Sequence, residues 1–255
     1  MLRSRIIPCL LLHRGGLVKT RQFKDAKYVG DPLNAVKIFN EKEVDELVFL
    51  DIDSTVEGRA PGMPLLRSLA VESRMPLCYG GGVTDAGKAA QIVATGFEKV
   101  SVSSAALDRP ALIREMAEAI GSQSVVVTLD VRANKIFSGH SIYSHNGRQK
   151  RREPLIEFCQ RAVELGAGEI VINSIDRDGE MAGYDIGLAR AVRSAVSTPI
   201  TFMGGAGGVA DLQSLIDAVG IVGAAAGSMF VFKGSYRAVL INYDRPARLR
   251  GPEYA

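Results

Sequence analysis

The sequence predicts an α/β fold of the (β/α)8 TIM-barrel type, with residues 1–255 forming one domain. Short apolar segments rich in β-formers alternate with segments of helical period, and no Pro/Gly/Ser-rich linker divides the chain. Several of the apolar segments are uncharged throughout, as parallel strands covered on both faces are. Eight strands and eight helices in about 250 residues fit a closed barrel. A doubly wound open sheet is the alternative.

The strands are predicted from the apolar runs between turn signals. In chain order they cover residues 5–12, 46–52, 77–79, 99–102, 124–130, 169–173, 200–203 and 223–226.

The helices are predicted from their start and stop signals. Starts are indicated at Asp31-Pro32, at Thr84-Asp85, at 108–110 and at Glu153-Pro154, where a capping side chain or a proline precedes a helical pattern. Glycines stand where four helices should end, at Gly96, Gly121, Gly166 and Gly220.

Composition excludes several classes of protein. Hydrophobic residues make up 47% and charged residues 23%, which is typical of a globular chain and not of a disordered one. A net charge of +3, from 31 basic and 28 acidic residues, is too balanced for a nucleic-acid-binding protein. Three cysteines without paired spacing fit a reducing compartment, and the apolar run 6–12 is too short to span a membrane. We therefore expect a cytoplasmic protein with no nucleic-acid or membrane partner.

The two halves of the chain resemble each other. Residues 49–53 are similar to 173–178, and 79–85 are similar to 203–211, so half-barrel repeats are expected over about 1–120 and 121–255. In both copies a strand ends in a glycine cluster followed by a helix start. Because parallel strands of a barrel end at one face, the clusters should lie on opposite sides of one mouth.

The glycine clusters predict two phosphate sites, since glycine lets backbone amides approach phosphate oxygens. Small polar residues one strand later could complete each site. The candidate residues are Gly82, Ser103, Ser104, Gly204, Gly205, Gly227 and Ser228. The structural alternative is that the glycines only serve tight turns.

Asp130 is the predicted general acid or base, because it ends an otherwise uncharged strand and should reach the mouth. The alternative is a carboxylate that caps a loop or pairs with Arg132. Asp51 and Asp176 occupy matching places in the repeat and could bind substrate or pair with cations such as Lys19 and Arg177; for Asp51 we expect pairing.

The repeat also reveals a missing acid. Aligning residues 7–11 with 126–130 places Leu11 opposite Asp130, where a pseudo-twofold enzyme would carry a second carboxylate.

Other chemical motifs are absent from the sequence. The three histidines have no acid or cysteine at metal-ligand spacing, and P-loop, GxSxG and GxGxxG motifs do not occur. No metal and no cofactor are therefore predicted. The basic cluster at 148–152 is expected to be a solvated loop or a grip on an anionic substrate, and the stretch 139–147 a loop.

Several segments resemble the HisF family, the cyclase subunit of imidazole glycerol phosphate synthase. They are 5–10, 45–52, Gly80-Gly81-Gly82, 96–101, 121–123, 166–170, 174–179 and 204–207, and the match spans essentially the whole chain. The resemblance implies a duplicated half-barrel that forms a heterodimer with a HisH-like glutaminase. It also implies that ammonia enters the barrel floor and leaves at the mouth, and that Asp176 and Gly179 belong to the substrate site.

The family's charged gate at the barrel floor is matched by Arg5, Glu46, Lys99 and Glu169. A structural ring of ion pairs is the alternative for these four residues. The family's aspartate on the first strand is replaced here by Leu11, so conduction of ammonia is matched while cyclase chemistry is altered.

The variant opening of the chain is similar to HisF-like proteins of O-antigen and other surface-polysaccharide pathways. Their resemblance implies ammonia supply for turning an acetamido group into an acetamidino group on a phosphorylated or nucleotide-linked sugar, beside an ATP-using amidotransferase. The alternatives are a genuine cyclase subunit of histidine biosynthesis and a catalytically silent scaffold that docks and activates a glutaminase.

Overall fold

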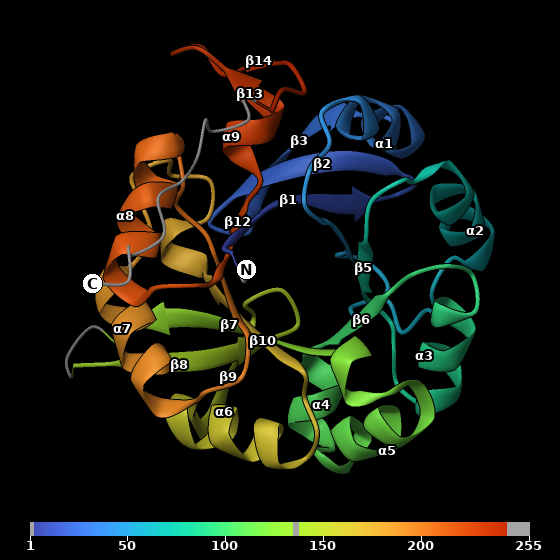
Figure 1. The fold of residues 1–255 in the computed structure, drawn as a ribbon, viewed down its shortest axis with the longest axis vertical. Helices are drawn as coiled ribbons and strands as arrows, with labels where there is room; N and C mark the ends of the chain where they lie inside the picture. Colours follow the sequence, from blue (N-terminus) through green and yellow to red (C-terminus); the bar gives the residue numbers. More distant parts are fainter. Residues whose placement is uncertain (1–2, 135–137, 244–255) are drawn as a thin grey trace.

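The computed structural model describes residues 3–134 and 138–243, and these form a closed barrel of parallel strands (Figure 1). The barrel strands are β1 (Arg5–His13), β4 (Leu47–Asp51), β5 (Leu77–Gly80), β6 (Lys99–Val102), β7 (Val125–Ala133), β10 (Glu169–Ser174), β11 (Ile200–Met203) and β12 (Gly223–Ala226). Strand β12 pairs with β1, and β10 pairs with β7, which closes the sheet. The predicted TIM barrel is confirmed, and the open-sheet alternative is wrong.

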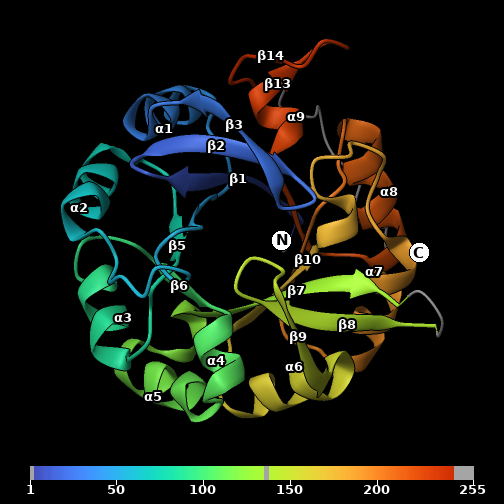
Figure 2. The ribbon, with the colours of Figure 1, turned by 180° about the vertical axis from the view of Figure 1, so that it is seen from behind.

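Strand β7 differs most from its predicted bounds, because it continues to Ala133. The extension pairs antiparallel with β8 (His140–Ser144), and β8 pairs with β9 (Gln149–Pro154). The predicted loops at 139–147 and 148–152 are therefore largely strands. A second hairpin, β2 (Gly16–Arg21) with β3 (Lys24–Gly30), follows β1. Both hairpins follow the carboxyl ends of barrel strands and lie on the face seen in Figure 2.

Helices cover the outside of the barrel (Figure 1). They are α1 (Pro32–Glu41), α2 (Met63–Glu72), α3 (Ala86–Val93), α5 (Ala111–Ile120), α6 (Leu155–Glu164), α7 (Ile186–Ala195) and α8 (Val209–Val219). Short α4 (Ser104–Asp108), η1 (Ser122–Ser124) and η2 (Ile175–Arg177) lie in the connections. In the described part of the chain, β12 is followed by α9 (Ser228–Val231) and the hairpin β13 (Phe232–Lys233)–β14 (Ala238–Val239) instead of an eighth long helix.

Two of the predicted caps are confirmed by hydrogen bonds. Asp31 accepts from the backbone N–H of Asn34, and Asp85 accepts from that of Lys88. At 108–110 the signal has a different meaning, because Asp108 is the last residue of α4 and α5 begins at Ala111. Pro154 ends β9 and only precedes α6.

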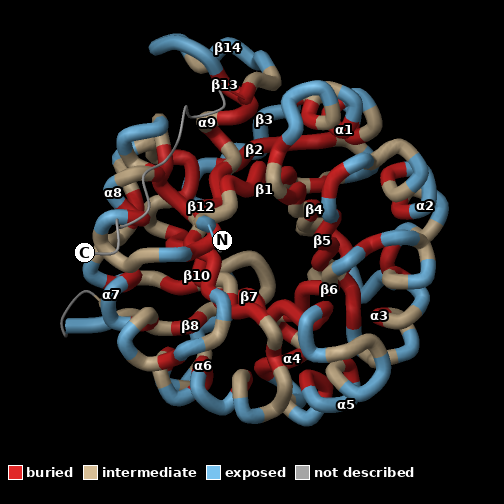
Figure 3. Tube along the Cα trace, viewed as in Figure 1, coloured by how far each residue is buried: buried red, intermediate tan, exposed pale blue. Residues whose placement is uncertain are grey.

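The hydrophobic core lies between the strands and the helices that cover them. Buried residues follow the strands and the inward faces of the helices (Figure 3), with Phe39, Phe49 and Phe97 among the largest side chains. Across the described ranges, none of the helices combines the length and apolar character needed to cross a membrane.

Candidate functional site

A cavity of about 350 Å³ opens at the carboxyl ends of the barrel strands. It is lined by the predicted residues Gly82, Ser103, Ser104, Asp130, Gly179, Gly204, Gly205, Gly227 and Ser228, and also by Leu11, Lys19, Asn173 and Asp178. Asp176 is not among the lining residues: its Oδ2 accepts a hydrogen bond from the backbone N–H of Ala133 at 2.9 Å. The structure thus brings the two halves of the chain together around one mouth, which we call the mouth cavity.

Asp130 projects into the mouth cavity from β7 and accepts a hydrogen bond at Oδ1 from Nδ2 of Asn173, at 2.8 Å. Burial raises the pKa of Asp130 to about 7, and the nearby charge of Asp178 acts in the same direction while the bond from Asn173 opposes it. The guanidinium of Arg132 lies instead 5.5 Å from the ring of Tyr143. At neutral pH this carboxyl can therefore either give or take a proton.

Leu11 places an alkyl side chain on the wall of the same cavity. Its backbone pairs with Leu50 on β4 and Val18 on β2. Position 11, where the repeat would lead one to expect an acid, thus lies at the mouth, as expected for a position that matches Asp130.

An ion pair between Lys19 and Asp178 was missed by the sequence reasoning. Lys19 Nζ lies 2.5 Å from Oδ1 of Asp178, so the expected pairing of Lys19 with Asp51 is wrong. Asp51 instead accepts hydrogen bonds from the backbone N–H groups of Asp53 and Ser54 and from the Ser54 hydroxyl. Asp178, the second acid of the 174–179 segment, is the residue from which the sequence could have indicated this pair. The turn η2 brings Asp178 to the mouth, whereas Asp176 points away from it.

The glycine clusters are required by the packing of their own turns. Gly82 has a φ of +67°, and a Cβ there would lie 2.4 Å from the carbonyl oxygen of Arg59. Gly205 has a φ of +112°, and a Cβ would lie 2.1 Å from that of Gly183. The geometry of both turns therefore requires glycine, whether or not a phosphate binds beside them.

Two serine hydroxyls beside these turns are buried without a hydrogen-bond partner among the described residues. They are Ser103 Oγ after β6 and Ser228 Oγ after β12. Ser104 Oγ accepts a hydrogen bond from the backbone N–H of His145 at 3.2 Å. A buried hydroxyl without a partner costs free energy that an anionic ligand oxygen would recover.

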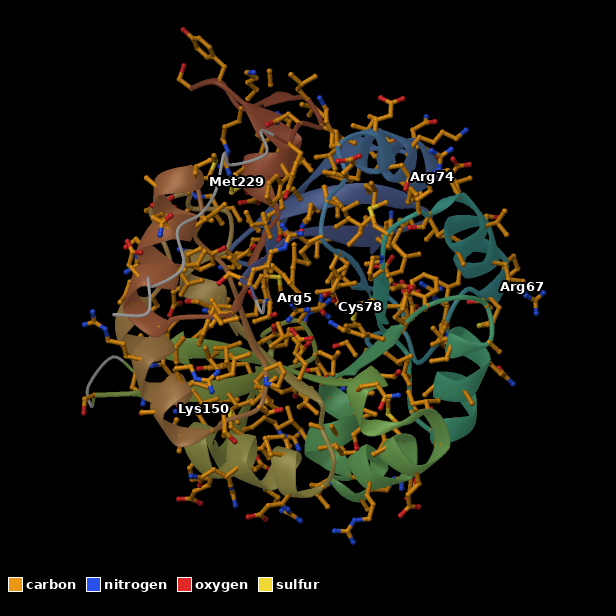
Figure 4. The ribbon with its side chains drawn as sticks, in the orientation of Figure 1. Arg5, Arg67, Arg74, Cys78, Lys150 and Met229 are labelled. Carbon is orange, nitrogen blue, oxygen red and sulfur yellow. The ribbon has the colours of Figure 1, made fainter. Side chains whose placement is uncertain are left out.

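Four charged residues form a layer at the opposite end of the barrel, near the strand starts, and we call it the charged floor. Arg5 binds both Glu46 and Glu169, with Nη2 lying 2.6 Å from Oε1 of Glu169. Lys99 Nζ lies 2.8 Å from an oxygen of each glutamate. Burial alone would raise the pKa of Glu169, but Arg5 and Lys99 outweigh it and lower the pKa to about 2. Figure 4 shows Arg5 and Cys78 inside the barrel.

A second cavity, of about 20 Å³, lies between the charged floor and the mouth. It has room for about one water-sized molecule. Its lining includes Glu46 and Glu169 from the floor, and it shares Cys9, Leu50, Ser101, Thr128 and Met203 with the mouth cavity. We call this cavity the bore and the five shared residues the upper ring. The bore therefore adjoins both ends of the barrel interior.

Of the described residues that line the bore, none above the floor carries an ionised side chain. Burial raises the pKa of Cys9 to about 12 and that of Cys78 well above its usual range, so both remain neutral thiols. Ser101 Oγ and Thr128 Oγ1 lie 2.7 Å apart and satisfy each other. Such a lining accommodates a small neutral molecule better than an ion.

No group of three or more His, Cys, Asp or Glu side chains that could hold a metal ion occurs within 3–134 and 138–243. His13 contacts Asp53 and His140 contacts Asp185, each through one ring nitrogen. In the basic cluster on β9, Arg151 pairs with Asp108 and Glu153.

Comparison of the sequence with known proteins shows which family the chain matches. The sequence model of the family described as "Histidine biosynthesis protein" matches residues 5–237. A Vibrio vulnificus protein named "Putative imidazole glycerol phosphate synthase subunit hisF3" is 52% identical over 247 residues, covering 97% of this chain and 95% of the relative. A Leptospira borgpetersenii protein named "Putative imidazole glycerol phosphate synthase subunit HisF" is 51% identical over 243 residues, covering 95% and 96%.

A relative whose printed name does not contain the word "Putative" is less similar to this chain. "Imidazole glycerol phosphate synthase subunit HisF" of Lysinibacillus sphaericus is 39% identical over 246 residues, covering 96% of this chain and 97% of the relative. All three comparisons extend over nearly the whole barrel.

Proposed function

Because the chain belongs to the histidine biosynthesis protein family, among the HisF synthase subunits, we propose that it conducts ammonia for an altered synthase reaction. In this proposal a HisH-like glutaminase docks at the charged floor as the second subunit of a heterodimer. Ammonia passes through the bore to the mouth cavity. There it serves the conversion of an acetamido group into an acetamidino group on a sugar used for surface polysaccharides.

The observation that carries the proposal is the alignment of the charged floor, the bore and the mouth cavity along one barrel interior. The floor and bore share Glu46 and Glu169, and the bore and mouth share the upper ring. Neutral thiols, hydroxyls and alkyl groups line the passage above the floor. Ammonia is small enough for this space and is neutral, so its desolvation costs far less than that of ammonium.

Altered chemistry is supported by Leu11. A reaction that needs two proton-transferring groups at the mouth has Asp130 on β7 but an alkyl group on β1. Loss of one such group costs about 10² to 10⁴ in rate. A genuine cyclase subunit of histidine biosynthesis is the second candidate, favoured by the 39% identity to the Lysinibacillus subunit.

A phosphorylated or nucleotide-linked sugar fits the mouth cavity in size and polarity. Its volume of about 350 Å³ lies within the range of small-molecule sites. Ser103 and Ser228 offer buried hydroxyls without partners in the described chain. Activation of an acetamido group requires ATP, and we assign that step to a separate amidotransferase, because the sequence carries no P-loop.

Blocking the bore tests the proposal directly. The substitution Cys78→Leu adds volume beside a cavity of about 20 Å³, and Cys159→Leu is the matched control because Cys159 packs between α6 and the barrel, outside the bore. The complex of this chain with its glutaminase and amidotransferase is supplied with ¹⁵N-amide glutamine or with ¹⁵N-ammonium chloride. Incorporation of ¹⁵N into the acetamido sugar is then measured by mass spectrometry.

We expect Cys78→Leu to lower incorporation from glutamine much more than incorporation from ammonium, and Cys159→Leu to lower neither selectively. If the chain is a silent scaffold that only activates the glutaminase, the ratio of ¹⁵N incorporation from glutamine to that from ammonium should be the same for both variants. Formation of imidazole glycerol phosphate by the unaltered chain at a cyclase-like rate would establish the second candidate instead.

A further inference from the structure

Asn173 is a buried amide at the point where the bore meets the mouth cavity. It lies on β10, is 5% exposed, and pairs in register with Asp130 on β7 and Met203 on β11. No role was assigned to it by sequence reasoning. Its side chain lines the mouth cavity together with Asp130.

The two ends of the Asn173 amide have different surroundings. Nδ2 donates to Asp130 Oδ1 at 2.8 Å, whereas Oδ1 is buried with no hydrogen-bond partner in the described chain. When Asp130 is ionised, its carboxylate only accepts hydrogen bonds, so the amide nitrogen then faces Asp130 and the amide oxygen faces away. A buried acceptor without a donor is destabilising, and a bound N–H group would remove that penalty.

The position of the pair is fixed by the alternation of side chains along the strands. Thr128 precedes Asp130 by two residues on β7, so both face the barrel interior. Thr128 and Met203 belong to the upper ring shared by bore and mouth cavity. A molecule that leaves the bore therefore meets Asp130 and Asn173 in the next layer of side chains.

We propose that Asp130 and Asn173 form a binding site for ammonia at the exit of the bore, with Asn173 as the residue that completes it. The site rests on the proposed conduction of ammonia. Ammonia has three N–H donors and one lone pair: the Asp130 carboxylate and the Asn173 Oδ1 accept two of the N–H groups. The lone pair is left directed away from both acceptors, toward the mouth cavity.

The charge around the pair attracts a cation less strongly than two carboxylates would. Two carboxylates at this exit would stabilise a cation, whereas here one carboxylate faces a neutral amide and the alkyl group of Leu11. Nearby, the Cys9 thiol is neutral, and Lys19 and Asp178 form an ion pair whose acid further raises the pKa of Asp130. Asn173 thus supplies a hydrogen-bond acceptor without a second negative charge.

An amide N–H of the sugar substrate could satisfy the same acceptor, and the experiment separates the two sources. The purified chain, labelled with ¹⁵N at asparagine side chains and ¹³C at aspartate carboxyls, is titrated with ammonium chloride above about pH 8, where Asp130 is ionised. Potassium chloride is the control for ionic effects, and acetamide is the probe for a substrate amide.

We expect saturable shifts of the Asn173 amide and the Asp130 carboxyl with ammonium chloride, tightening as the pH rises and more of the probe is uncharged. Asn173→Leu should weaken binding by about tenfold, read at Asp130, because one hydrogen bond is lost. Asn173→Ser keeps a small polar group should the leucine variant fail to fold, and is expected to bind between the two. Asn34→Leu, on the exposed face of α1, should bind as the unaltered chain.

Equal shifts with potassium chloride would identify an adventitious ion only and overturn the site. Shifts with acetamide but not with ammonium would assign Asn173 to the substrate, and unchanged affinity in Asn173→Leu would remove it from the site. Each of these results is independent of the Cys78→Leu isotope ratio. Failure of the ammonia site would therefore leave conduction through the bore unaffected, and failure of conduction would not by itself remove the site.

Discussion

Lys19 Nζ lies 2.5 Å from Oδ1 of Asp178, and this buried ion pair fastens the β2–β3 hairpin to the turn after β10. The other carboxylate oxygen accepts from the Thr20 hydroxyl at 2.8 Å, and the Gln22 N–H donates to the Asp178 carbonyl, also at 2.8 Å. The contacts of Asp178 thus help to hold the hairpin across one side of the mouth cavity.

Replacing Lys19 by methionine should destabilise the protein by about 3–5 kcal/mol, because Asp178 is then left buried without its cation. Removing both partners, in Lys19→Met with Asp178→Leu, should recover part of the loss. The measurement is the midpoint of urea unfolding. Arg21→Gln breaks the exposed pair of Arg21 with Glu180 on the same hairpin and should cost at most about 1 kcal/mol. Similar losses for Lys19→Met and Arg21→Gln would contradict the importance of burial.

Asp130 should make stability depend on pH. Burial raises its pKa from 3.8 to about 7, so between these values the folded chain retains a proton that the unfolded chain has lost. The folded state therefore loses stability as the pH rises from about 4 to about 7, by up to about 4 kcal/mol at 1.36 kcal/mol for each unit of pKa shift.

Asp130→Asn removes this penalty while keeping the shape of the side chain. We expect the variant to be more stable than the unaltered chain at about pH 8 and equal to it below about pH 4, as measured by urea unfolding across this range. Glu118→Gln on the exposed side of α5 should show no such trend. A stability difference that does not change with pH would show that Asp130 titrates at its ordinary value.

The barrel strands could be predicted from the sequence because each is a short apolar run ended by a turn signal. The β8–β9 hairpin could not, since β9 is mostly exposed and carries Lys150, Arg151 and Arg152 instead of alternating apolar residues. Polar residues of this kind are common on edge strands, where they hinder unwanted pairing.

The site was predictable in its location but not in its pairings. Asp176 and Asp178 look equivalent in the sequence. Only the turn η2, which contains Asp176 and ends directly before Asp178, decides which one reaches Lys19. The free oxygen of Asn173 depends on a contact between two strands that are distant in the sequence, so no local pattern could reveal it.

Ser103 and Ser228, whose hydroxyls lack a hydrogen-bond partner in the part of the chain that the structure describes, should bind phosphate. Each hydroxyl that donates to a charged oxygen contributes about 1.5–3 kcal/mol, so Ser103→Ala and Ser228→Ala should each weaken binding of inorganic phosphate or a sugar phosphate by about tenfold or more. Isothermal titration measures the affinities, and Ser194→Ala on the exposed side of α7 is the control. A crystal grown in abundant phosphate should show the anion near Gly82 with Ser104 and near Gly205 with Ser228. Unchanged affinity in both serine variants would leave the hydroxyls without this role.

Leu11 should separate this chain from a genuine cyclase. Mixed with ammonium and the ribonucleotide intermediate of the histidine pathway, the unaltered chain should form no imidazole glycerol phosphate at a cyclase-like rate. Leu11→Asp should gain activity, because it returns an acid to the wall opposite Asp130 in the repeat, and general acid–base catalysis contributes about 10² to 10⁴. Leu11→Asn has nearly the same shape without the acid and should gain nothing. Product is measured by chromatography, and strong activity in the unaltered chain would refute the prediction.

The charged floor should act as a gate and not only as a structural ring. Its two acids and two bases pair without net charge, and Lys99, like Arg5, contacts both glutamates. Lys99→Ala leaves Glu46 and Glu169 with Arg5 alone, so an excess negative charge and new space appear at the entrance. Water and cations then compete with ammonia, and ammonia escapes before it reaches the bore.

We expect ¹⁵N transfer from glutamine to fall severalfold more than transfer from added ammonium, with Lys37→Ala on the exposed face of α1 changing neither. The melting temperature should also fall, because a buried ion-pair network loses a member, so the ratio of the two transfers is the deciding quantity. Equal losses from both nitrogen sources, in proportion to the fall in melting temperature, would assign the four residues to closing the barrel floor.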